Sequence, residues 1–323
     1  MKVCITIITF LILSLTGYTQ GKEKKQVIFD TDIGPDYDDV GAIAMLHNLA
    51  DKGEVDILAT ISCNHHYLTG PTLEVFNTYF KRPNIPIAVP KGLAANLGAS
   101  QKWPQMLMEK YPHKLNTNDD FPNAVTLYRK ILSEAKDSSV VIVAVGFLTN
   151  LSDLLNSPKD KISNQTGFEL VSKKVKKLVS MAGKFPEGRE YNVYKDTVSA
   201  INVFNNWPTK IIFSGWEIGN EIKTGLKLIK NKKLNNSPVK DTYVHSIPMQ
   251  KQDAEGRMSW DQTAVLVGVR GIDSYFGVER GAVRLGNNGY NYWKDDGLGK
   301  HFYLIKKMDY KKLTDTIEDL MMR

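Results

Sequence analysis

The sequence VIFDTDIGPDYDD, residues 27–39, places a short β-rich run directly before a turn with five aspartates in ten residues. Residues 26–29 predict a strand, and residues 40–49 carry apolar side chains at helical spacing. A strand, a turn and a helix in this order predict the first half of a βαβ unit. The aspartates would repel one another if all were ionised, so the turn predicts a bound cation.

The same alternation of strand and helix continues along the chain. Further strands are expected at residues 55–62, 85–89, 140–145, 175–181 and 210–213, and helices at 73–80, 125–135, 148–155 and 198–204. Residues 140–145 are all apolar, which is typical of a strand buried on both faces of a parallel sheet. The pattern predicts an α/β fold with a doubly wound, mostly parallel central sheet and helices on both faces. Residues 230–253 are polar, and we expect a flap or helical excursion near the site.

The composition is that of an ordinary globular protein. The 323 residues are 42% hydrophobic and 24% charged, which is enough for a sizeable core. The net charge of +7 could indicate a nucleic-acid partner, but the basic residues lie in short scattered runs without interleaved aromatic side chains. We therefore expect no nucleic-acid binding. Because no internal repeat or low-complexity linker interrupts the chain, residues 26–323 are predicted to form a single domain.

Residues 1–20 have the pattern of a secretory signal peptide. Lys2 supplies a positive charge, residues 3–15 are apolar, and small and polar residues follow. The apolar run is too short to span a bilayer as a helix, so we expect no stable membrane insertion after the signal is removed. The protein is predicted to be exported, either to the periplasm or into the medium. Cys4 would leave with the signal, and Cys63 alone cannot form an intrachain disulfide.

The aspartates after the first strand suit a hard metal ion. Oxygen ligands without His or Cys favour Ca²⁺, Mg²⁺ or Mn²⁺ over zinc. Such an ion needs more oxygen atoms than one turn supplies, and the Thr149 carbonyl group and Asp261 are candidates. A simpler alternative is that Asp38 or Asp39 caps the next helix and that Asp261 interacts with the dipole of another.

Five later segments combine with the acidic run into a family resemblance. Their sequences are ATISCN at residues 59–64, VAVGFLTN at 143–150, VSMAG at 179–183, EYNVYKD at 190–196 and WDQTA at 260–264. In order and spacing, the six segments resemble those of the inosine–uridine-preferring nucleoside hydrolases. The resemblance extends from residue 26 to about residue 270. It implies an enzyme that cleaves the N-glycosidic bond of ribonucleosides to free base and ribose.

The resemblance also implies a metal site. It assigns a Ca²⁺ ion to Asp32, Asp39, the backbone carbonyl group of Thr149 and Asp261. The ion would bind a water molecule and the 2′- and 3′-hydroxyls of ribose, with Asp32 as the general base for that water. A site built around both hydroxyls predicts a preference for ribose over 2′-deoxyribose.

The resemblance assigns further residues to the substrate. Asp38, Asn64 and Asn192 would hold the ribose hydroxyls, and Glu190 would reach the 5′ side. The partner would therefore be a small ribonucleoside. Because members of the family are often oligomeric, we also expect a homo-oligomer.

Two positions depart from the family pattern. The acidic loop is two residues longer than usual, so Asp36 is a further possible metal ligand. Trp260 stands where many members have a histidine that helps to protonate the leaving base. An indole cannot donate a proton at neutral pH, but it can stack on a base, which makes Trp260 a substrate-binding candidate.

The leaving group therefore needs another source of activation. The candidates for a proton donor are His65, His66 and His245, and those for lining the base pocket are Tyr191, Tyr194 and Trp293.

Two other functions compete with the hydrolase. A haloacid-dehalogenase-like phosphatase also places Asp-x-Asp after its first strand, but it leaves the five later segments unexplained. A catalytically weak or inactive ribose- or nucleoside-binding protein of the same fold is favoured by Trp260. Asp32 argues against it, because a protein that only binds needs no base beside the water.

Overall fold

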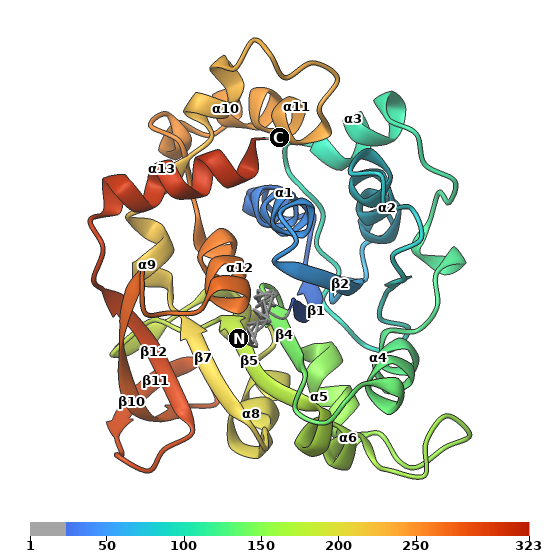
Figure 1. Ribbon diagram of the computed structural model, residues 1–323, viewed down its shortest axis with the longest axis vertical. Helices are drawn as coiled ribbons and strands as arrows, with labels where there is room; N and C mark the ends of the chain where they lie inside the picture. Colours follow the sequence, from blue (N-terminus) through green and yellow to red (C-terminus); the bar gives the residue numbers. More distant parts are fainter. Residues whose placement is uncertain (1–23, 323) are drawn as a thin grey trace, which may run out of the picture.

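A ten-stranded sheet organises the protein in the computed structural model, which describes residues 24–322 (Figure 1). The strand order is β3-β2-β1-β4-β5-β7-β12-β10-β11-β6. All neighbouring strands from β3 to β12 in this order run parallel. Six of them are β1 (Lys25–Thr31), β2 (Val55–Ser62), β3 (Ile87–Ala88), β4 (Val140–Ala144), β5 (Val175–Met181) and β7 (Lys210–Ser214).

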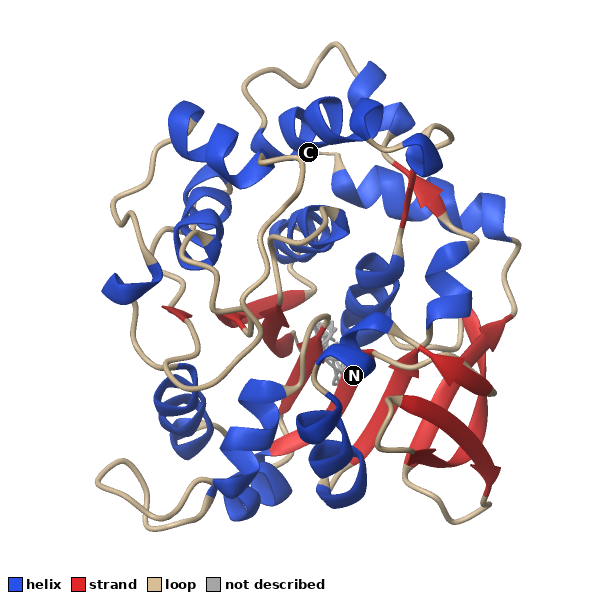
Figure 2. Cartoon of the chain, turned by 180° about the vertical axis from the view of Figure 1, so that it is seen from behind, coloured by secondary structure: helices blue, strands red, loops and turns tan. Residues whose placement is uncertain are grey.

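Helices cover both faces of the sheet, which confirms the predicted doubly wound fold (Figures 1 and 2). Alternate residues of β1 enter different cores, with Val27 and Phe29 in one and Ile28 in the other. The first core holds α1 (Asp38–Asp51), α2 (Thr69–Tyr79), α12 (Trp260–Arg270) and α13 (Tyr310–Met321). The second holds α4 (Ala124–Glu134), α5 (Thr149–Asn156), α6 (Gly167–Lys174) and α8 (Thr197–Asn206).

An antiparallel extension lengthens the sheet on one side. It begins at β12 (His301–Lys306), which is parallel to β7, and adds β10 (Phe276–Leu285), β11 (Tyr290–Asp295) and β6 (Glu187–Arg189). The sequence pattern did not predict these strands. They are only partly buried and mix charged with apolar residues, so they lack the continuous apolar runs that mark the parallel strands.

The polar stretch at residues 230–253 forms the predicted helical excursion. It contains α11 (Pro238–Ser246) and two short 3₁₀ turns that lead toward the site. The smaller elements are α3 (Trp103–Lys110), a 3₁₀ turn (Asn118–Asp120), α7 (Tyr191–Lys195), α9 (Trp216–Asn220), α10 (Leu226–Lys230), β8 (Lys223–Thr224) and β9 (Arg257–Met258).

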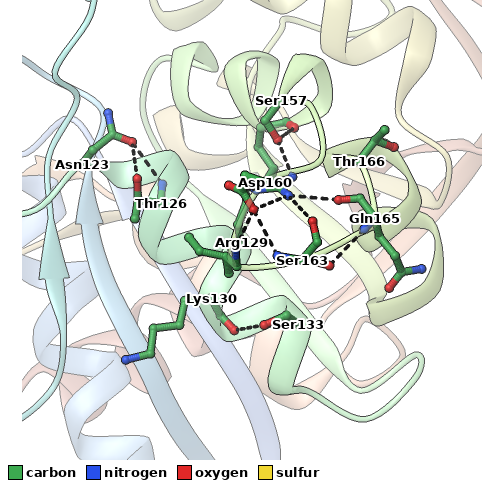
Figure 3. A network of polar contacts seen from close by, with 12 residues as sticks. Asn123, Thr126, Arg129, Lys130, Ser133, Ser157, Asp160, Ser163, Gln165 and Thr166 are labelled. Atoms are coloured by element: carbon green, nitrogen blue, oxygen red, sulfur yellow. Dashed lines mark hydrogen bonds and ion pairs between the residues drawn. The ribbon is translucent and has the colours of Figure 1, made fainter.

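A buried arginine holds the loop between α5 and α6 in place (Figure 3). Arg129 binds Asp160 through Nε and Nη2, both at 2.9 Å, and donates from Nη1 to the Ser157 hydroxyl. Its Nη2 also donates to the Gln165 carbonyl oxygen at 2.9 Å. These contacts satisfy a buried charge and hold the loop that follows α5.

Two predictions concern the N-terminal region and the membrane. The signal peptide at residues 1–20 lies outside the described residues. Among residues 24–322, no helix has the length and apolar character that a membrane crossing requires. Cys63 is buried with a free thiol.

Candidate active site

The site lies where the order of the parallel strands reverses. From β1, the chain adds β2 on one side and β4 on the other, and the loop after β1 begins at this switch point. Ligands of doubly wound sheets bind at such a point, outside the carboxyl ends of the strands. The loop continues into α1, whose first two residues are Asp38 and Asp39.

Two helices bring acidic residues to this edge. Asp38 and Asp39 lie in the first turn of α1, and Asp261 lies in the first turn of α12. The Asp261 N–H group donates to Asp38 Oδ2 at 3.4 Å, which links the two helix starts. The N-terminal ends of both helices favour negative charge.

Asp32, Asp39 and Asp261 are three buried carboxyl groups whose charges act on one another. Burial raises the pKa of each carboxyl well above its usual value, and neighbouring carboxylates raise it further. A bound cation would stabilise the ionised forms of these carboxyl groups.

Asp39 offers the clearest donor atom for a cation. Its Oδ1 accepts a hydrogen bond from the Thr31 hydroxyl, whereas its buried Oδ2 has no hydrogen-bond partner among the described residues. Within residues 24–322, no three His, Cys, Asp or Glu side chains form a ready metal-binding group. The donors therefore fit a hard cation in chemistry, while the carboxylates are not gathered around one point.

Asp38 has a different environment. Its Oδ1 accepts from Nε of Arg257 at 3.1 Å and from Nη2 of the same guanidinium at 2.7 Å. Burial raises the pKa of Asp38 to about 7, with Arg257 acting in the opposite direction. Asp38 is thus ion-paired with the guanidinium group of Arg257.

Glu190 and Asn192 come from the start of α7. Glu190 caps α7 and accepts backbone hydrogen bonds from Asn192, Val193 and Gly183 at 2.8–3.1 Å. Burial raises its pKa to about 7, and these donors oppose the shift. The Asn192 amide nitrogen donates to the carbonyl oxygens of Val145 and Met181 at 3.3 and 3.2 Å, which fixes the side chain.

A cavity of about 280 Å³ gathers most of the predicted site residues. Those that line it are Asp32, Asp36, Asp38, Glu190, Asn192, Trp260 and Asp261. Tyr191, a candidate for the base pocket, also lines it. Carboxylate and amide groups thus surround one small hollow, which suits a ligand with several hydroxyl groups.

Three predicted residues lie behind this lining. Asp39 is fully buried beside Thr31. Asn64 uses its side-chain amide on backbone groups, donating to the Asp32 carbonyl at 3.0 Å and accepting from Leu97 N–H at 3.0 Å. Thr149 begins α5, and its hydroxyl donates to Asp196 at 2.5 Å. The assigned roles of all three stay predictions.

The proposed proton donors lie elsewhere. The cavity lining, taken over the described residues, contains none of His65, His66 and His245. His245 contacts the Gln101 carbonyl oxygen at 2.7 Å. Tyr194 and Trp293 also lie outside the lining.

Several lining residues could not be found from local sequence. Trp216 accepts a hydrogen bond on its carbonyl oxygen from the Trp260 indole N–H at 2.8 Å, and the two ring centroids are 6.4 Å apart. Gln252 comes from the helical excursion, and Arg257 from β9. No motif surrounds these residues, and only tertiary packing brings them to the acidic loop.

Comparisons with known proteins agree with this arrangement. A family model described as inosine-uridine preferring nucleoside hydrolase matches residues 27–315. No curated protein matches the chain. Among solved structures, a plant nucleoside hydrolase, the PpNRh1 enzyme, has a TM-score of 0.71 at 19% identity, covering 93% of this chain and 99% of that one.

Two further structures share the fold. An inosine-guanosine nucleoside hydrolase has a TM-score of 0.69 at 19% identity, covering 92% of this chain and 98% of its own. The type III effector protein XopQ, solved in complex with adenosine diphosphate ribose, has a TM-score of 0.67 at 12% identity, covering 92% of both chains. At these identities the likeness concerns the fold.

Proposed function

Because this chain belongs to the inosine-uridine preferring nucleoside hydrolase family, we propose that it is an exported hydrolase that depends on Ca²⁺. Family membership makes it a glycosidase that hydrolyses the N-glycosyl bond of ribonucleosides. The observation that carries the proposal is the convergence of Asp32, Asp38, Glu190, Asn192 and Asp261 on one cavity. The choice of Ca²⁺ and the export are the steps beyond the family.

The family is metal-dependent, and Asp32, Asp39, Asp261 and the Thr149 carbonyl group would hold the metal. Support comes from the unpartnered Oδ2 of Asp39 and from a donor set made only of oxygen. Hard oxygen donors suit Ca²⁺. When bound, the ion would supply Lewis-acid activation of water and a grip on vicinal hydroxyls.

The side chains around the cavity would perform the remaining work. Asp32 would accept a proton from the attacking water, which requires its ionised form. Cleavage of the ribosyl–base bond builds positive charge on the sugar, and the carboxylate and amide oxygens around the ribose would stabilise that charge. Asp38 would hold the ribose hydroxyls. Asn192 and Glu190 would orient the ribose through its hydroxyl groups.

The leaving base would lie against Trp260. Its indole ring lines the cavity and is tied to Trp216, so it offers a fixed face for stacking. The indole supplies no proton to the departing base. We therefore expect faster cleavage of nucleosides whose bases leave without enzymatic protonation.

The deciding experiment is a substrate panel. Protein comprising residues 26–323 would be incubated with ribonucleosides and their 2′-deoxy forms, with Ca²⁺ or after chelation, and free ribose would be assayed. We expect ribose release that needs Ca²⁺ and is lost with deoxynucleosides and in Asp32→Ala. Equal cleavage after chelation would overturn the metal dependence.

A binding protein of the same fold is the second candidate, favoured by Trp260 at the position expected to serve the leaving group. It predicts metal-dependent binding of ribose or a nucleoside without turnover. Adenosine diphosphate ribose belongs in the binding panel, because the structurally similar XopQ was solved with it.

Export has its own test. Full-length protein would be expressed in a bacterium, the cells fractionated, and the N-terminus of the product sequenced. We expect a periplasmic or secreted protein that begins near residues 17–21, as the signal pattern predicts. Cytoplasmic protein that retains Met1 would contradict export.

A further inference from the structure

A buried arginine stands among the acidic residues of the site. Arg257 is only 4% exposed and lies four residues before Asp261 in the chain. Its guanidinium group binds Asp38 Oδ1 through two nitrogens and Asp36 Oδ2 at 2.5 Å through one of them. One fixed cation therefore neutralises two carboxylates from the acidic loop and the start of α1.

Aromatic rings hold the guanidinium group in place. Its central carbon lies 5.2 Å from the centre of the Tyr37 ring and 5.1 Å from that of Trp260. Tyr37 is itself fixed, because its hydroxyl donates to Asp253 Oδ2 at 2.6 Å. Asp253 is fully buried and lies 3.8 Å from Arg257 Nη1.

These contacts pair the longer acidic loop with one distant segment. Asp36 binds Arg257, and the next residue, Tyr37, binds Asp253. The two partners are four residues apart and directly precede α12, which carries Asp261. The loop from β1 and the start of α12 are thus joined by two polar contacts beside the cavity. We call these four residues the Arg257 clamp.

The clamp divides the carboxylates into two groups. Asp36 and Asp38 have ion pairs with Arg257. Asp32, Asp39 and Asp261 have none in the part of the chain that the structure describes. A divalent cation would bind more favourably to the three unpaired carboxylates, because binding to a paired one requires breaking a buried ion pair.

We propose that Arg257 is a positioning residue that withdraws Asp36 from the cation and reserves Asp38 for the ribose. The clamp holds Asp38 against the start of α12, where it faces the cavity. The part of this inference that concerns ribose rests on the proposed function. Lysine would not serve equally well, since only the guanidinium fork can bind both carboxylates in one plane.

Cation binding tests the first half of the proposal. Calorimetric titration with Ca²⁺ would compare wild type, Asp36→Asn and Asp39→Asn. Asp36 is 44% exposed in its side chain, so the first variant is expected to fold. We expect its Ca²⁺ affinity to stay within about threefold of wild type, and that of Asp39→Asn to fall by more than about tenfold. Equal losses would make Asp36 a ligand and overturn the proposal.

Ribose binding tests the second half. Calorimetric titration with ribose at saturating Ca²⁺ would compare wild type, Arg257→Lys and Arg257→Met. We expect affinity to fall about tenfold in Arg257→Lys and further in Arg257→Met. For a cleaved nucleoside, KM should rise while kcat changes less than about threefold, because ground-state positioning is lost. Unchanged ribose affinity in both variants would overturn the proposal.

A matched control separates positioning from general damage. Arg270 forms a comparable bidentate pair with Glu54, at 2.8 and 2.7 Å, at the other end of α12. Arg270→Lys should leave ribose affinity and KM unchanged. Equal losses in this variant and Arg257→Lys would assign the effect to the helix as a whole and overturn the proposal. If Arg257→Met does not fold, the ribose affinities of Arg257→Lys and Tyr37→Phe are compared with that of wild type instead.

The two proposals can fail separately. Wild-type protein that binds Ca²⁺ and ribose but cleaves no nucleoside contradicts the proposed function, and the variant titrations still support or overturn the clamp. Wild-type protein that binds neither ligand overturns both.

Discussion

Asp32 has the position of a general base, because it is a buried carboxylate on the cavity wall directly after β1. Replacement by Asn keeps its shape and removes the proton acceptor. At saturating Ca²⁺, we expect Asp32→Asn to lower kcat by about 10²–10⁴-fold. Steady-state kinetics with the best nucleoside measures this, and Asp56→Asn at the exposed pair with Lys24 is the control. A kcat close to wild type would remove Asp32 from the reaction.

Trp260 tests the stacking of the leaving base. We expect Trp260→Ala to raise KM about tenfold, because a stacked base contributes about 1–3 kcal/mol. Trp260→Phe keeps an aromatic face and should show a smaller rise. The comparison of KM for the two variants measures the effect of the ring. Equal KM values in wild type and Trp260→Ala would show that the base lies elsewhere.

At the scale of elements, close contact between two strand ends positions Asp32. Gly146 follows β4, and a Cβ atom there would lie 2.5 Å from the Asp32 nitrogen and 2.7 Å from Cys63 Sγ. Only glycine fits this approach, because the nearest atoms include backbone. The turn after β4 is therefore part of the machinery that places the base, although it carries no reactive group.

This packing leads to a prediction for Gly146→Ala. We expect a loss of about 1–3 kcal/mol in the free energy of unfolding, together with a fall in kcat as Asp32 is displaced. Denaturant titration and steady-state kinetics measure the two effects. Gly297→Ala is the matched control, because a Cβ there meets nothing within 4 Å. Wild-type stability and kcat in Gly146→Ala would show that the strand ends can move apart without consequence.

At the scale of the whole molecule, buried carboxyl groups couple stability to pH. Burial raises the pKa of Asp30 and of Glu190 to about 7, well above their usual values. Both groups prefer the neutral form in the folded protein. Their contribution to stability is therefore complete below the unfolded pKa values and is lost as pH rises through about 7.

We therefore expect the cation-free protein to lose stability between about pH 5 and pH 8, by on the order of 1–3 kcal/mol. Denaturant titrations with chelator across this range measure the slope. Glu190→Gln should reduce it, because the variant has no carboxyl to titrate. Ca²⁺ at about 100 times its Kd should return about 2.7 kcal/mol at pH 8. Stability that rises with pH in chelator would contradict this account.

The parallel part of the sheet and most of the candidate site residues could be predicted from the sequence. Continuous apolar runs such as residues 140–145 mark buried strands, because burial on both faces leaves no room for polar side chains. Asp32, Asp38 and Asp261 were recognisable from short motifs, since the ends of strands and the starts of helices are local features. The antiparallel strands β10 to β12 were missed because their half-exposed faces carry mixed residues.

Which aspartates pair with an arginine and which do not could not be predicted from the sequence. Arg257 meets Asp36 and Asp38 across 221 and 219 residues of chain, and Tyr37 meets Asp253 across 216. No local period or spacing encodes such pairs, because they form only when α1 and α12 pack over the same sheet. The sequence by itself determined the parallel strands, the helices that follow them and the oxygen-bearing side chains at their ends. Packing alone set which carboxylates an arginine neutralises and which remain for a cation, because that depends on distances between segments far apart in the chain.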